Sequence, residues 1–268
     1  MITDELIRAY DRDGAILLRG VFDDWIETIE AGIARNLEDP GPYASENAVK
    51  DGEGRFFDDY CNWTRIPEFE MMVRESCAGE IAARVMGSGT ARFFHDHVLV
   101  KESGTFMATP WHQDAPYYFV DSAQTVSMWI PVDAVYSASL RLIAGSHRWK
   151  RMVRPVSWAD DSDFYDQGNA GDWIPVPNPD VSPEDMRVLE WRMEPGDAVL
   201  FHFRTLHGAR GNPGSQRRRV LSLRWFGDDA RFVSRPGRTS PPFPGHGMTD
   251  GEQLREDWFP VIWRAENT

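Results

Sequence analysis

The feature that most constrains the fold of this chain is a change of hydrophobic period near residue 91. Before that point, apolar residues recur every three or four positions, which predicts amphipathic helices. After it, short apolar runs alternate with turn residues, which predicts a series of short strands. Helices followed by many strands indicate a mainly β (α+β) fold, in which N-terminal helices buttress a jelly roll or a barrel.

The predicted helices occupy the first third of the chain. One begins after Thr3 and ends at Gly14, a second spans residues 23–37, and a third spans residues 67–86. A short strand at 15–19 separates the first two. The apolar stripes on these helices predict packing against a core rather than ligand binding.

The organisation of the whole chain predicts one compact domain. Neither an internal repeat nor a linker divides the chain, so we expect a single domain over residues 1–268. It should comprise helical support over about 1–90, a jelly-roll core over about 91–228 and a C-terminal extension over about 229–268. The expected strands are 91–101, 125–132, 140–143, 188–193, 197–203 and 218–226.

Two long segments break the strand pattern: a proline-rich one at about 230–250 and one at about 150–185. The latter carries several aspartates together with Trp158 and Trp173. Long irregular segments inside a compact domain are either functional or disordered, and the aromatic residues favour function. We therefore expect a lid over a binding site.

Composition argues against several classes of function. A net charge of −13 does not suit a nucleic-acid-binding protein, which needs a concentrated basic face. No apolar stretch approaches the roughly 18 residues of a membrane span, and the N-terminus does not resemble a signal peptide.

Cys61 and Cys77 are the only cysteines, so two thiols in a reducing cytoplasm are expected, with a single disulfide as the alternative. The sequence leaves the oligomeric state open.

The segment Trp111-His112-Gln113-Asp114 holds a candidate metal site. His112 and Asp114 are two residues apart, which on a strand puts both side chains on one face. A second histidine would complete the two-histidine, one-carboxylate triad that leaves open positions on Fe(II). Among the seven histidines, His207 is the strongest candidate because it ends an apolar strand before a glycine turn. Alone, the His112/Asp114 spacing is also typical of a hydrogen-bonded surface pair.

Arg218 strengthens the interpretation of His112, Asp114 and His207 as an iron site. It lies eleven residues after His207, near the start of a strand whose alternation puts Arg218, Val220 and Ser222 on one face. A guanidinium facing a mostly buried site needs a carboxylate partner, and a 2-oxoacid chelated to iron supplies one. Arg217 and Arg219 should point the other way, into solvent.

Several motifs between residues 91 and 226 together resemble the phytanoyl-CoA dioxygenase family of iron and 2-oxoglutarate oxygenases. They are Val-Leu-Val-Lys-Glu-Ser-Gly at 98–104, Trp-His-Gln-Asp at 111–114, Leu-Arg-Leu-Ile-Ala-Gly-Ser-His at 140–147, Pro-Gly-Asp at 195–197 and His-Gly-Ala at 207–209. The resemblance implies a double-stranded β-helix, a cupin-like jelly roll. It also implies that His112, Asp114 and His207 bind Fe(II), and that Arg218 clamps the distal carboxylate of 2-oxoglutarate.

The same resemblance implies that Trp129 and His97 form part of the co-substrate wall. Some family members carry a serine two residues after the distal histidine, where this chain has Ala209, so Ser222 is expected to supply the missing hydrogen bond. The implied activity is hydroxylation of an unactivated carbon of a small molecule, lipid-like or a natural-product acid. Fe(II) is the metal, 2-oxoglutarate and O2 are consumed, and succinate and CO2 are released. Asp114 fills the position that halogenating relatives leave for chloride, which favours hydroxylation.

The substrate pocket is expected to contain Tyr117, Tyr118, Phe94, Arg141 and a lid tryptophan, a mixture that suits an apolar body with a polar handle. Desaturation, epoxidation or ring formation could replace hydroxylation. The alternative from another class is a cupin-like metal-binding isomerase or a non-catalytic ligand-binding protein, neither of which needs the Arg218 clamp. An oxygenase acting on protein or nucleic acid would prefer an open basic groove, which the net charge does not support.

Overall fold

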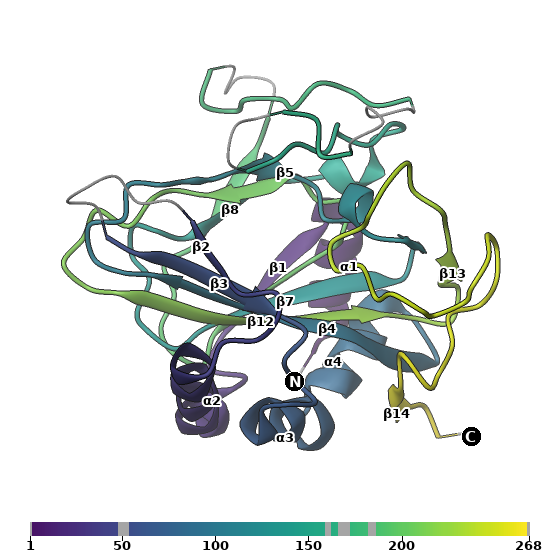
Figure 1. Cartoon of the computed structure of the whole chain (residues 1–268), viewed down its shortest axis with the longest axis horizontal. Helices are drawn as coiled ribbons and strands as arrows, with labels where there is room; N and C mark the ends of the chain where they lie inside the picture. The colour runs from purple at the N-terminus through teal and green to yellow at the C-terminus, as the bar shows by residue number, and fades with distance from the viewer. Residues whose placement is uncertain (1, 48–53, 159–161, 166–171, 182–185, 267–268) are drawn as a thin grey trace.

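The computed structural model describes residues 2–47, 54–158, 162–165, 172–181 and 186–266. Two antiparallel sheets form a jelly roll, with helices packed beneath the larger sheet (Figure 1). The larger sheet has the order β1 (Ala15–Leu18), β10 (Ala198–Phe201), β7 (Thr125–Pro131), β12 (Arg218–Phe226), β4 (Thr90–Lys101), β3 (Phe56–Tyr60) and β2 (Ser45–Asn47). The predicted fold class is confirmed.

A smaller sheet lies across from the larger one (Figure 1). Its order is β5 (Thr109–His112), β11 (His207–Ala209), β8 (Leu140–Ile143) and β9 (Val188–Glu190). A third, two-stranded sheet pairs β13 (Arg231–Phe232) with β6 (Val120–Asp121). Strands β8 and β9 fall within predicted strands, whereas β5 and β11 were not predicted, because four and three residues that include Pro110 and Gly208 show no apolar period.

The first two helices, α1 (Asp4–Asp13) and α2 (Ile26–Glu38), form where the sequence predicts them. The Thr3 side chain accepts the Leu6 N–H at 3.3 Å and so caps α1. Gly14 ends the helix in the left-handed conformation, at φ 75°, which glycine adopts without steric cost. The apolar face of α2 contributes Ile29 and Ile33 to the main core.

The predicted third helix is wrong in one respect, because two helices replace it: α3 (Pro67–Glu75) and α4 (Ala78–Met86). Ser76 separates them in an extended conformation. Its hydroxyl donates to the Met72 carbonyl at 2.5 Å and accepts the Ala78 N–H at 3.2 Å, so a serine side chain replaces helical backbone bonds on both sides of the break. Cys77 consequently lies at the start of α4.

Strand β3 was missed by the sequence prediction because Phe-Phe-Asp-Asp-Tyr contains two aspartates, which are unfavourable in strands. Tertiary contacts override that preference. Asp59 is fully buried, and its carboxylate accepts hydrogen bonds from the Asn36 side chain and the Gly41 N–H, both at 2.7 Å. Strand β3 pairs with β4 and so extends the larger sheet beside the site described below.

The C-terminal extension packs against the core. Its last strand, β14 (Val261–Arg264), pairs with β4. The preceding residues contribute Phe232, Leu254 and Phe259 to an aromatic cluster around Phe94. Cys61 and Cys77 are free, as predicted. Within the described ranges, no helix has the length and apolar character needed to cross a membrane.

Candidate metal centre and its cavity

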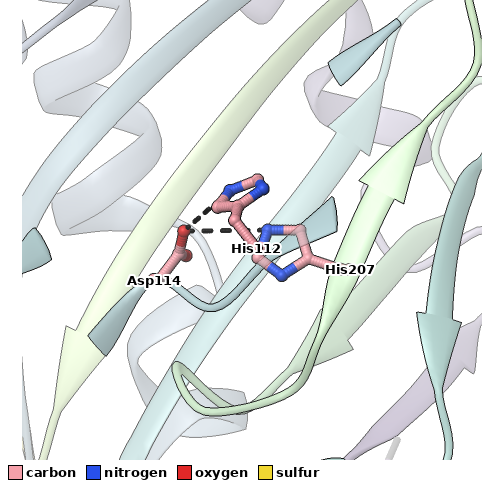
Figure 2. Close-up of side chains that lie close together, drawn as sticks. All are labelled: His112, Asp114 and His207. Atoms are coloured by element: carbon pink, nitrogen blue, oxygen red, sulfur yellow. Dashed lines mark ion pairs between the residues drawn. The ribbon is translucent and has the colours of Figure 1, made fainter. Parts of the chain in front are cut away.

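Strand pairing brings the three predicted metal ligands together. His207 begins β11 directly opposite His112, the last residue of β5, and Asp114 follows two residues later (Figure 2). Asp114 Oδ1 lies 3.5 Å from His112 Nε2 and 3.7 Å from His207 Nε2. The ligand atoms of the three residues all lie within 4.8 Å of one another, and the three residues are buried.

The other polar atoms of these side chains are already occupied, which aims one ligand atom from each toward a common point. The Nδ1 atoms of His112 and His207 lie 2.8 Å and 2.9 Å from the carbonyls of Pro110 and Thr205. Because a carbonyl only accepts, each Nδ1 carries the proton and each Nε2 keeps its lone pair. Two neutral imidazoles and one carboxylate oxygen therefore fit a divalent first-row metal.

Burial and charge favour the metal-binding protonation states. Burial, assisted by neighbouring His112, lowers the pKa of His207 to about 3 and keeps its imidazole neutral. Burial by itself opposes ionisation of Asp114, but the charge of Arg224 outweighs it and holds the pKa of Asp114 below its usual value. Ser127 donates to Asp114 Oδ2 at 3.1 Å, which leaves Oδ1 for the metal.

Two details of the predicted local structure are wrong, although the three residues converge. Asp114 lies beyond β5 with helical backbone angles, ahead of the short 3-10 turn Ala115–Tyr117, so strand alternation does not explain its orientation. His207 begins a strand instead of ending one. The preceding strand stops at Phe201, and a turn closed by the Thr205 N–H and the His202 carbonyl reverses the chain before His207.

A cavity of about 400 Å³ opens beside His112 and Asp114. Strands β3 and β4 form one wall, and part of the segment predicted as a lid forms another. The C-terminal extension closes the rim. The lining residues are Asp58, Tyr60, His95, His97, His112, Asp114, Tyr117, Tyr118, Val156, Ser157, Trp158, Phe164, Arg224, Ser240 and Pro241.

The wall from the predicted lid segment is tied to the metal site by Gln113. Its side chain lies between the two ligands in sequence and accepts the Val153 N–H at 2.8 Å. It also donates to the Arg204 carbonyl at 2.5 Å, near His207. Residues 159–161, 166–171 and 182–185 of the predicted lid lie outside the described residues.

Four of the residues predicted to contact substrate or co-substrate line this cavity: His97, Tyr117, Tyr118 and the tryptophan Trp158. The other predicted tryptophan, Trp173, lines a separate surface groove.

Phe94 and Arg141, predicted to contact substrate, lie elsewhere. Phe94 is buried behind Tyr118, with ring centroids 5.1 Å apart, in the aromatic cluster. Leu142 is the β8 residue paired with His207, so Arg141 beside it points away from the cavity and forms ion pairs with Asp180 and Glu190. The geometry gives these two predictions no support.

The residues predicted to hold the co-substrate include a buried cation, Arg218. Arg218 is 3% exposed, donates to the Ala138 carbonyl at 2.8 Å and lies over the Trp129 ring. No carboxylate among the described residues pairs with it, and burial lowers its pKa to about 10. Arg218 Nε and Ser222 Oγ are buried without hydrogen-bond partners. A buried cation beside unpaired polar atoms fits a carboxylate ligand.

Lys101 is a candidate that the sequence reasoning missed. It pairs with Arg218 across β4 and β12, is fully buried, and donates to the Met107 and Arg210 carbonyls. Burial, assisted by the charge of Arg218, lowers the pKa of Lys101 to about 6. A lysine directly after the apolar run Val98-Leu99-Val100 was the available signal. Asp58, Tyr60 and Arg224 were also missed; Arg224 continues the alternation of Arg218 and Ser222 along β12.

Comparison with known proteins assigns the chain to a family. The model of the family described as phytanoyl-CoA dioxygenase matches residues 10–220, most of the chain. The chain belongs to the phytanoyl-CoA dioxygenase family. This confirms the prediction made from the motifs, and it makes the protein a 2-oxoglutarate-dependent oxygenase with an iron site rather than a cupin-like isomerase or a binding module.

Solved structures with the same fold extend the comparison. The α-ketoglutarate-dependent carbocyclase SnoK from nogalamycin biosynthesis is 22% identical, with a TM-score of 0.73, over 98% of this chain and 97% of that one. The epimerase SnoN from the same biosynthesis is 20% identical, with a TM-score of 0.75, over 97% and 98%. EctD from S. alaskensis, with 2-oxoglutarate and 5-hydroxyectoine, is 19% identical, with a TM-score of 0.69, over 99% and 87%. These likenesses show the jelly-roll fold.

Proposed function

We propose that this member of the phytanoyl-CoA dioxygenase family hydroxylates an unactivated carbon of a small molecule, lipid-like or a natural-product acid. One observation carries the proposal: His112, Asp114 and His207 aim their free ligand atoms at one point beside a partly aromatic cavity. Such a centre has no need of an acid or base from the protein. Its geometry serves to hold a metal and admit a ligand.

Iron and 2-oxoglutarate supply the oxidising chemistry, in which dioxygen is consumed and succinate and CO2 are released. The chain's own residues position the ligands and exclude water from the site. We assign Arg218 to the distal carboxylate of 2-oxoglutarate, with Lys101 and Ser222 beside it and with Trp129 and His97 as walls. Tyr117 and Trp158 cover the cavity next to His112 and exclude water.

Hydroxylation is the preferred outcome because Asp114 supplies the third protein ligand and leaves no position for chloride. The related structures include a protein described as a carbocyclase and one described as an epimerase, so product analysis must separate hydroxylation from ring formation and epimerisation. We place the enzyme in the cytoplasm, as its free cysteines favour.

The metal and co-substrate can be tested without knowing the substrate. Under nitrogen, Fe(II) and 2-oxoglutarate should give the purified protein a weak visible charge-transfer band. His112→Ala and Asp114→Ala should abolish it, whereas His246→Ala, at a histidine away from the cavity, should keep it. Absence of the band from wild-type protein that has bound iron would contradict the assignment of 2-oxoglutarate as the co-substrate.

The substrate is found by measuring succinate formation across a library of small acids, lipids and natural products. A true substrate should raise succinate above the basal rate and yield a product heavier by one oxygen atom. A product of unchanged mass or one lighter by two hydrogens would replace hydroxylation by epimerisation, ring closure or desaturation.

A further inference from the structure

Among the described residues that line the cavity, Arg224 is the one lysine or arginine. It lies on β12 and is 5% exposed, beside the metal ligands. Its Nε donates to the Tyr118 hydroxyl at 2.7 Å and lies 3.6 Å from Asp114 Oδ2. An arginine stays charged at any physiological pH, so the cavity has a fixed positive charge next to the metal site.

Most of the hydrogen-bonding capacity of Arg224 is unused. Nη1 has a single contact, at 3.5 Å, with the Ser222 carbonyl. Nη2 makes no hydrogen bond within the described part of the chain. A guanidinium holds its N–H donors in a planar arrangement that matches the two oxygens of a carboxylate. Burying such a group without acceptors for its donors costs free energy, which a bound carboxylate ligand would offset.

We propose that Arg224 binds a carboxylate of the substrate, so that the enzyme acts on monocarboxylic acids whose reacting carbon lies only a few bonds from the carboxylate. The inference rests on the proposed function and narrows its substrate class. The reacting carbon must lie near the substrate carboxylate because Arg224 is within 4 Å of the proposed metal ligand Asp114. An acid group bound to Arg224 therefore keeps its adjacent carbons close to the metal.

The rest of the cavity supports one acid group and an apolar body. Tyr117, Trp158 and Phe164 present aromatic surface. The far end carries the carboxylate of Asp58. On β4, Arg224 is paired with His95 and Asp58 with Leu99, four residues further along, or about 13 Å at the usual strand rise. A second carboxylate on the substrate would meet no second lysine or arginine among the described residues that line the cavity.

Orienting Asp114 is the competing role for Arg224, and the geometry favours it less. Ser127 already donates to Asp114 Oδ2 at 3.1 Å, whereas Arg224 Nε lies 3.6 Å away, beyond an ordinary hydrogen bond. Binding 2-oxoglutarate is a second competing role. Arg218, without a carboxylate partner and without a place among the residues lining this cavity, is better suited to the co-substrate.

The test uses matched ligands that differ only in charge. Wild-type protein loaded with Fe(II) and 2-oxoglutarate under nitrogen is titrated with phenylacetate, 3-phenylpropionate and cyclohexanecarboxylate, and with the three corresponding primary amides. Calorimetry and the shift of the charge-transfer band give Kd without turnover. We expect at least one acid to bind about tenfold or more tightly than its amide, as a charge-assisted pair predicts.

Arg224→Met should abolish the preference for the acid, and Arg224→Lys should restore part of it. The matched control is Arg92→Met, which removes another buried arginine, one that donates to the Leu254 and Phe259 carbonyls outside the cavity. It should keep the preference. A role confined to orienting Asp114 would instead weaken iron binding in Arg224→Met and leave the ratio of acid to amide unchanged.

The proposal is overturned if no acid in the panel binds wild-type protein, if amides bind as tightly as acids, or if Arg224→Met chiefly raises the Kd of 2-oxoglutarate. The wild-type comparison of acid with amide needs no variant, so it holds even if Arg224→Met fails to fold. Loss of the proposed function is separate, because it would appear as a missing charge-transfer band in the wild-type sample before any acid is added.

Discussion

The Tyr117 hydroxyl is bonded twice to one residue: it donates to the Val156 carbonyl and accepts the Val156 N–H, each at 2.8 Å. Tyr117 comes three residues after the proposed metal ligand Asp114, whereas Val156 belongs to the segment that forms one wall of the cavity. One phenol therefore joins the turn that follows Asp114 to a wall of the cavity.

Tyr117→Phe should loosen this wall while leaving the metal ligands in place. Two backbone groups of Val156 lose their partner, so we expect a loss of about 1–2 kcal/mol in the free energy of unfolding. Water entry should also raise the ratio of succinate formed to product formed. Denaturant unfolding and coupled turnover measure the two effects. Tyr136→Phe, at an exposed tyrosine bonded to Glu194, is the control and should change neither.

Arg218→Ala should weaken 2-oxoglutarate binding by about 10- to 100-fold, the range expected for losing a charge-assisted pair, and should leave iron bound. Titration of the charge-transfer band with 2-oxoglutarate measures the change. Arg217→Ala removes the exposed neighbouring arginine and should have no effect. Equal affinity in wild-type protein and Arg218→Ala would move the co-substrate clamp to another residue.

Ser127→Ala should reduce iron affinity by roughly tenfold, because partners of metal-binding carboxylates orient their ligand atoms. The serine donates to Asp114 Oδ2 and leaves Oδ1 facing the histidines. Competition with a chelator under nitrogen measures the affinity. Ser122→Ala removes a serine that bonds Asp229 near the surface, and its iron affinity should match that of wild type. Unchanged affinity in Ser127→Ala would mean that the backbone or the nearby Arg224, 3.6 Å from Oδ2, orients Asp114 instead.

Lys101 should make stability depend on pH. Its pKa falls from the ordinary 10.5 to about 6 in the folded protein, because of burial and the charge of Arg218. Between those values the unfolded chain binds a proton that the folded chain does not, so the contribution of Lys101 to the free energy of unfolding rises with pH and is smallest at about pH 6 and below. Lys101→Met should flatten this slope between about pH 7 and 9 in denaturant titrations. Lys150→Met, at an exposed lysine, should keep it; a slope unchanged by Lys101→Met would contradict the shift.

Local sequence predicted the long elements well. Helices α1 and α2 and strands β4, β7 and β12 have enough residues to display a period, and their ends carry recognisable caps and turns. It predicted the break at Ser76 poorly, because a serine side chain that bonds backbone on both sides leaves the apolar stripe intact. It also missed β3, where buried hydrogen bonds compensate two aspartates.

The metal ligands were recognisable because their chemistry is carried by residue type and by motif. Cavity residues such as Asp58, Tyr60 and Arg224 were not, since none belongs to a motif and each reaches the cavity only through strand pairing. Phe94 and Arg141 show the reverse error. Both had suitable side chains, but strand direction and neighbouring packing turn them away from the cavity.

The amino-acid sequence by itself determined the class of fold, the family and the three side chains that can hold iron, because periodicity and ligand chemistry are local properties of the chain. Only the tertiary structure decided how those ligands meet. The β5–β11 pairing sets His207 against His112, and a short turn, not strand alternation, directs Asp114 toward them. It also placed Arg224 beside that centre and Arg218 away from the cavity lining. Such separations depend on which strands pair, and pairing is a property of the whole chain.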